Sequence, residues 1–168
     1  MRCTVYIGKC LLIDTRPGLE AASLLTLYDF IMANKLFCNR FLTLQSTEKG
    51  HTASFSAFVS FNSYLYQHAY RSGRATMYSY LTLLIFLVLV EDPSLAKLLC
   101  ETSAPVRLCR QRPPYLPVPK PDRPYAASIV DLLTDAINHN LRRRLDTSFY
   151  ILNCTSANTS ISISPLFS

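Results

Sequence analysis

The side chains best suited to nucleophilic or metal chemistry in this sequence are six cysteines and three histidines. A thiolate sulfur is a strong nucleophile, and thiolates and imidazoles are the ligands that zinc prefers. No two cysteines form a C-x-x-C pair; the closest pairs, Cys3 with Cys10 and Cys100 with Cys109, leave six and eight residues between their members. The spacing therefore indicates neither a zinc site nor a dithiol redox site.

Known catalytic motifs are also missing from the sequence. It contains no G-x-S-x-G nucleophile elbow, no G-x-x-x-x-G-K-[ST] or G-x-G-x-x-G phosphate loop and no H-E-x-x-H zinc motif. His51, His68 and His139 fall in different predicted elements. The sequence therefore predicts a protein that is not an enzyme and needs no cofactor or small-molecule substrate. One enzyme class stays open, a cysteine-dependent enzyme whose dyad forms only in the fold.

One set of ionisable residues is spaced as metal ligands are on a helix. Asp131, Asp135 and His139 stand at positions i, i+4 and i+8. However, carboxylates early in a helix and the later triplet Arg142 to Arg144 are what the helix dipole favours. We therefore interpret this segment as a solvated amphipathic helix that binds no metal.

The N-terminus predicts a reducing environment. It has neither a long apolar segment nor a small-residue cleavage site, so we expect the chain in the cytosol with its thiols reduced. In that compartment the sequons at Asn153 and Asn158 are chance matches.

A basic, proline-rich segment is the predicted contact surface. The formal net charge is +6, and seven prolines between Pro105 and Pro124 exclude a helix there. Asp122 is the one acidic residue in this segment, so its positive charge suits a protein partner or a peripheral contact with an anionic membrane. The alternative is a solvated structural connector. The candidate contact residues are Arg107, Arg110, Arg112, Lys120 and Arg123. The aromatics are not interleaved with these cations as in nucleic-acid modules, so no nucleic acid is expected.

Helical periodicity dominates the rest of the chain. Apolar residues recur at three- and four-residue steps over 19–37, 53–70 and 125–145, and Asp92 with Pro93 is a typical helix start. In the last helix the predicted inward face is Ile129, Leu133, Ala136, Ile137 and Leu141.

The most apolar segment, Met77 to Val90, could be either a core helix or a membrane anchor. A membrane-spanning helix needs about 20 apolar residues, and this run is shorter. We therefore predict a central helix buried on all sides. The alternative is a small single-pass membrane protein anchored by residues 77–90.

These elements predict an all-α fold of about four to five helices with a proline-rich connector, in the manner of an armadillo/HEAT-like α-solenoid. The predicted divisions are an irregular segment at 1–18, a helical domain fragment at 19–150 and a Ser/Thr-rich disordered tail at 151–168.

Several segments together resemble one known family. They are Ser63 to His68, Leu84 to Asp92, Val106 to Leu108, Asp122 to Pro124, Ser128 to Leu132 and Asp146 to Tyr150. In order and spacing they resemble the C-terminal region of the armadillo-like helical domain-containing protein 3 family, over roughly 19–150. The tail after Tyr150 departs from the family, because a helix is expected there.

That resemblance implies a role and a place in the cell. Members are large helical-repeat proteins of the cytosol and Golgi without known catalytic activity. The resemblance implies a scaffold or adaptor that engages a Golgi phosphatidylinositol 4-kinase, helps maintain phosphatidylinositol 4-phosphate and supports secretory traffic. The implied localisation is cytoplasmic and peripheral to Golgi membranes, and the alternative is integral in a membrane.

Overall fold

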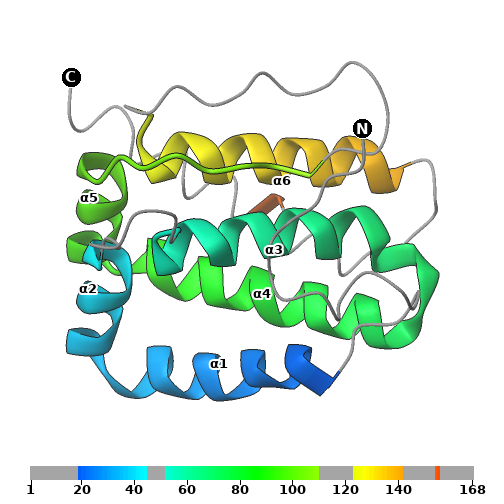
Figure 1. Cartoon of the computed structure of the whole chain (residues 1–168), viewed down its shortest axis with the longest axis horizontal. Helices are drawn as coiled ribbons and strands as arrows, with labels where there is room; N and C mark the ends of the chain where they lie inside the picture. The colour runs from blue at the N-terminus through cyan, green and yellow to red at the C-terminus, as the bar shows by residue number, and fades with distance from the viewer. Residues whose placement is uncertain (1–18, 45–51, 110–122, 142–153, 156–168) are drawn as a thin grey trace.

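The computed structural model describes residues 19–44, 52–109, 123–141 and 154–155 (Figure 1). In these ranges the regular structure is helical, and the sole β-type contact is an isolated bridge between Ser103 and Pro124. The prediction of an all-α fold is confirmed for this part of the chain. The elements are η1 (Leu19–Ala22), α1 (Ser23–Ala33), α2 (Lys35–Thr43), α3 (Ser54–His68), η2 (Ala69–Arg71), α4 (Gly73–Glu91), α5 (Pro93–Glu101) and α6 (Tyr125–Leu141).

Helix α3 lies at the centre of the bundle. Eleven of its fifteen residues are buried. It packs against α6 on one side and against α4 on the other, and α1 packs against α4 (Figure 1). The chain turns at η2, so α3 and α4 form an antiparallel pair.

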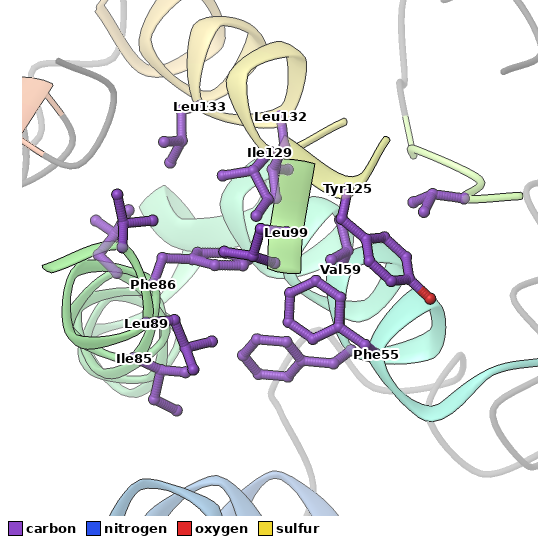
Figure 2. Close-up of a cluster of buried hydrophobic side chains, with 14 of the residues drawn as sticks. Phe55, Val59, Ile85, Phe86, Leu89, Leu99, Tyr125, Ile129, Leu132 and Leu133 are labelled. Atoms are coloured by element: carbon purple, nitrogen blue, oxygen red, sulfur yellow. The ribbon is translucent and has the colours of Figure 1, made fainter. Parts of the chain in front are cut away.

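One hydrophobic core joins the helices. Figure 2 shows side chains from α3, α4, α5 and α6 converging on it, among them Phe55, Phe86, Leu99 and Ile129. Each of these four is at most 1% exposed. Edge-to-face and tilted ring contacts, such as the 4.7 Å approach of the Phe55 and Tyr125 centroids, add to the burial of apolar area.

The first predicted helix is two helices. Residues 19–37 were expected to form one helix, but α1 ends at Ala33 and α2 begins at Lys35. Asn34 between them has an extended backbone, and its side-chain oxygen accepts hydrogen bonds from the N–H groups of Leu36 and Phe37. An asparagine that caps a new helix in this way also ends the one before it.

The prediction that the apolar segment is buried on all sides is wrong. Helix α4 covers 73–91, and its Leu83, Ile85, Phe86 and Leu89 are fully buried. However, Met77 is 71% exposed. Helices α1, α3 and α5 pack against other parts of its circumference, and the part that carries Met77 remains uncovered.

The later helices begin where the sequence predicts. Asp92 is the N-cap of α5, its carboxylate accepts the N–H of Ser94, and Pro93 takes the first position. The start of α6 at Tyr125 also agrees, and Ile129, Leu133 and Ala136 are buried. Leu141 is 63% exposed, so its assignment to the inward face is wrong. The described part of α6 ends there.

The predicted divisions at 1–18 and 151–168 lie outside the described residues, apart from 154–155. Of the proline-rich connector, residues 105–109 and 123–124 are described, and they form no helix.

Candidate functional site

An apolar stripe on the uncovered side of α4 is the candidate functional site. Met77, Leu81, Leu84 and Val88 follow one another at steps of four, three and four residues, so they lie on one face of the helix. We call these four residues the α4 stripe. Met77 and Leu84 are exposed, whereas Leu81 and Val88 are partly buried against the core.

The chemistry of this face follows from the composition of α4. The helix is apolar around nearly its whole circumference, whereas a helix on the surface of a soluble bundle ordinarily has a polar outer face. An exposed apolar stripe can bind another apolar surface, either lipid or protein. It carries no group suited to acid–base or nucleophilic chemistry.

Cationic and amphipathic side chains lie at the N-terminal end of the stripe. Arg71 and Arg74 are exposed there. The Arg71 guanidinium lies 5.8 Å from the ring centroid of Tyr70, and its Nε donates to the Tyr70 hydroxyl at 3.4 Å. Ser72 caps the helix by accepting the N–H of Ala75.

The C-terminal end of the stripe is acidic. Glu91 is exposed. The Asp92 carboxylate lies 2.6 Å from the Lys35 ammonium. Hydrogen bonds from Lys35 and from the N–H of Ser94 hold the pKa of Asp92 below its usual value. The two ends of the stripe therefore differ in charge.

Helix α4 is long and apolar enough to cross a membrane. It has 19 residues, and its mean hydropathy reaches 1.6, but 44% of that window is buried inside the bundle. Its inner side also makes polar contacts, because the Thr82 hydroxyl donates to the Tyr66 hydroxyl at 3.1 Å. A core helix passes the same test of length and composition.

Two of the five predicted basic contact residues are described. Arg107 is exposed on the extended segment that follows α5. Arg123 forms an ion pair with Asp131 of α6, with 2.7 Å between guanidinium and carboxylate, so part of its charge is used within the fold. Arg110, Arg112 and Lys120 lie outside the described residues.

The aligned ionisable residues of α6 hold the bundle together. Asp131 pairs with Arg123, Asp135 accepts a hydrogen bond from Gln67 at 2.6 Å, and the His139 ring lies 3.1 Å from the Gln67 carbonyl oxygen. In the described ranges, no three His, Cys, Asp or Glu side chains group as metal ligands.

Sequence reasoning missed the buried polar residues of α3. Ser63 accepts the N–H of Cys109 at 2.7 Å and donates to the Ser60 carbonyl, so it holds the segment after α5 against α3. The Ser56 and Tyr125 hydroxyls lie 3.2 Å apart. The available signal was the recurrence of serine every three or four residues among aromatics at 56, 60 and 63.

The described thiols differ in burial. Loss of solvation raises the pKa of Cys38 and of Cys100, which lowers the thiolate fraction near neutral pH. Cys109 is buried and Cys154 is exposed. Neither Cys38 nor Cys100 therefore has the lowered pKa of an activated nucleophile.

The chain is 32% identical over 139 residues to a UPF0588 membrane protein of Schizosaccharomyces pombe. The match covers 81% of this chain and 23% of that protein, so the chain spans about a quarter of its relative. No protein-family model and no solved structure matches the chain.

Proposed function

We propose that this chain belongs to a non-enzymatic helical scaffold that works at a membrane surface and holds a protein partner there. The exposed α4 stripe carries the proposal, because a folded bundle that leaves its longest described helix, which is strongly apolar, partly uncovered has a surface suited to lipid or to another protein. The name of the yeast relative supports the membrane part of the proposal.

The proposal includes a helical-repeat architecture for this all-α fold. The antiparallel pair α3 and α4 lies between α6 and α1, and this order of layers supports the proposal of a short α-solenoid segment. A solenoid offers extended surfaces for partners and needs no catalytic cleft.

The proposed partner follows from the family resemblance. It is a Golgi phosphatidylinositol 4-kinase, whose recruitment would maintain phosphatidylinositol 4-phosphate. The exposure of Arg107 supports such a contact through the basic segment. Capture of the kinase by the tagged full chain tests this. Loss of capture when Arg107, Arg110 and Arg112 are replaced by Glu would support the basic segment as the contact, and unchanged capture would leave that segment a connector.

Cell fractionation tests the membrane part. We expect the full chain in the membrane pellet and its release by a carbonate wash, since that wash removes peripheral proteins and leaves spanning ones. A chain found wholly in the soluble fraction would contradict membrane association.

The second candidate is a single-pass membrane protein anchored by residues 77–90. Its support is the length and hydropathy of α4. It requires α4 to leave the core, although Leu83, Ile85, Phe86 and Leu89 of that helix are 0% exposed in the bundle. Resistance to carbonate together with a need for detergent would establish this candidate.

A further inference from the structure

We propose that the α4 stripe is the membrane-contact element: it lies flat in one leaflet of an anionic bilayer while α4 keeps its place in the bundle. This inference rests on the proposed function and names the surface, the lipid class and the depth of the contact. The bilayer is the partner that covers the stripe.

The dimensions of the stripe fit an in-plane contact. From Met77 to Val88 the stripe extends over eleven residue steps, or roughly 16 Å at the rise of an α-helix. An interfacial helix buries its apolar face to about 5–10 Å below the headgroups. The side chains of Met77 and Leu84 are the exposed groups that would enter this layer.

The inner face of α4 limits how deep the helix can go. Phe86 and Leu89 are fully buried against α3 and its neighbours, and Thr82 is hydrogen-bonded to Tyr66. Crossing the bilayer would expose the core partners of these residues to water. A shallow contact keeps the core intact and still removes the stripe from water.

The charges around the stripe favour anionic lipid. Arg71 and Arg74 at its N-terminal end can place their guanidinium groups among lipid phosphates while their stems cover the apolar surface. Tyr70, 37% exposed and beneath Arg71, has the apolar ring and polar tip typical of the membrane interface. Glu91 at the other end is repelled by the same surface, so the attraction to anionic lipid comes from the arginine end of the stripe.

The combination of exposed apolar residues with nearby cations and an amphipathic ring favours lipid over a protein as the partner of the stripe. The exposed apolar residues sit beside two arginines and a tyrosine at one end. The +6 charge of the chain draws it toward anionic surfaces in general. Charge repulsion between the arginines of two chains disfavours a parallel contact with a second copy through the stripe, and an antiparallel contact is an outcome that the test below distinguishes.

Vesicle sedimentation of the purified full chain tests the apolar part. The probes are phosphatidylcholine vesicles with and without phosphatidylserine. Met77→Asp alone, and Met77→Asp with Leu84→Asp, should weaken binding to the anionic vesicles at least about tenfold. Leu141→Asp is the matched control, because Leu141 is 63% exposed on α6, which packs on α3; its binding should equal that of the wild type. Circular dichroism and the melting temperature show that each variant is folded, and Met77 is exposed enough for its variant to fold.

Charge reversal tests the lipid class. Arg71→Glu with Arg74→Glu should weaken binding to anionic vesicles by about fivefold for each arginine lost, and added salt should reduce the difference. Arg40→Glu on α2 is the matched control, with an exposed arginine away from the stripe. Equal binding of the wild type to vesicles with and without phosphatidylserine would overturn the assignment to anionic lipid.

The outcomes separate this inference from the proposed function. If the Met77 and Leu84 variants leave vesicle binding unchanged while the chain still sediments with cell membranes, the stripe is not the contact and the scaffold proposal stands. If the wild type binds neither vesicles nor cell membranes, both proposals fail. Carbonate resistance would overturn the in-plane contact in favour of a span, and a stripe-dependent dimer in analytical ultracentrifugation would assign the stripe to a second copy.

Discussion

Two fully buried asparagines on neighbouring helices differ in their hydrogen bonding. The Asn140 amide donates to the carbonyl oxygens of Tyr66 and Ala136 at 3.0 and 2.9 Å. Neither side-chain polar atom of Asn62 on α3 has a hydrogen-bond partner, although the residue is 0% exposed. A buried amide without partners loses its solvation and gains nothing in return.

Replacing each asparagine by leucine should therefore change stability in opposite directions. We expect Asn62→Leu to raise the free energy of unfolding by about 1–3 kcal/mol, since leucine has a similar size and no polar group to desolvate. Asn140→Leu should lower it by a similar amount, because two buried carbonyl contacts are lost. Urea unfolding followed by circular dichroism measures both. A stabilised Asn140→Leu would contradict the hydrogen-bonding argument.

Asp92 combines a helix cap with an ion pair. Its carboxylate accepts the N–H of Ser94 and pairs with Lys35 of α2. Hydrogen bonding from Lys35 is the largest cause of its lowered pKa. A carboxyl with a lowered pKa stabilises the fold above its unfolded pKa of about 3.9, and this stabilisation is lost as the pH falls through the folded value.

Asparagine separates the two roles of Asp92, since it caps helices as well as aspartate does but carries no charge. Asp92→Asn should cost less than about 1 kcal/mol at pH 7 and should flatten the loss of stability below pH 4. Asp92→Ala should cost about 1 kcal/mol more, because the cap is also lost. Melting temperatures between pH 2 and 7 measure the profiles. If the melting temperature of Asp92→Asn fell below pH 4 as steeply as that of the wild type, the ion pair with Lys35 would make no contribution to stability.

At the scale of the elements, α4 has one face in the core and one face uncovered. Leu83 is 0% exposed, whereas its neighbour Leu84 is 36% exposed. Leu83→Ala should lower the free energy of unfolding by about 2–5 kcal/mol, because it leaves a cavity in the core. Leu84→Ala should cost less than about 1 kcal/mol. Chemical denaturation of the two variants is the measurement, and equal losses would contradict this orientation of α4.

Helix periodicity predicted α3 and α6 because their apolar residues repeat at the helical period, whereas α4 was predicted from its long apolar run and α5 from the Asp92–Pro93 start. It failed at Asn34, where the apolar pattern continues across a break. One asparagine side chain that bonds two backbone N–H groups decides the geometry there, and periodicity is insensitive to it. Hydrophobic composition alone could not show which face of α4 stays uncovered, because that helix is apolar around nearly its whole circumference.

At the scale of the whole molecule, the candidate site depends on contacts between distant segments. Exposure of the α4 stripe follows from where α1 and α3 pack, and the pairing of Arg123 with Asp131 follows from the path of the chain into α6. The composition of the sequence was enough to identify the basic segment. It could not predict the ion pair between Arg123 and Asp131, because charge patterning along a sequence does not show which charges meet in space.

Two buried cysteines lie in parts of the molecule held by different contacts. Cys38 is in α2, where its thiol donates to the Ile31 carbonyl oxygen at 3.4 Å. Cys109 is in the extended segment after α5, fixed through its backbone N–H to Ser63 and through the buried Val106. Regular helical hydrogen bonds hold the first cysteine, whereas the second lies in a segment that forms no helix.

Thiol labelling compares the opening of these two parts. In a variant whose other four cysteines are serine, Cys109 should react at least about tenfold faster than Cys38 in native buffer, after each rate is divided by its rate in denaturant. That correction removes differences in reactivity between the two thiols in the unfolded chain; the raised pKa of Cys38 belongs to the folded state and plays no part once the thiol is exposed by opening. The expected difference arises because an extended segment at the edge of a bundle can open without unfolding the helices, whereas α2 is held by helical hydrogen bonds. Equal corrected rates would instead mean that α2 and the segment after α5 open only when the whole core of the described helices unfolds.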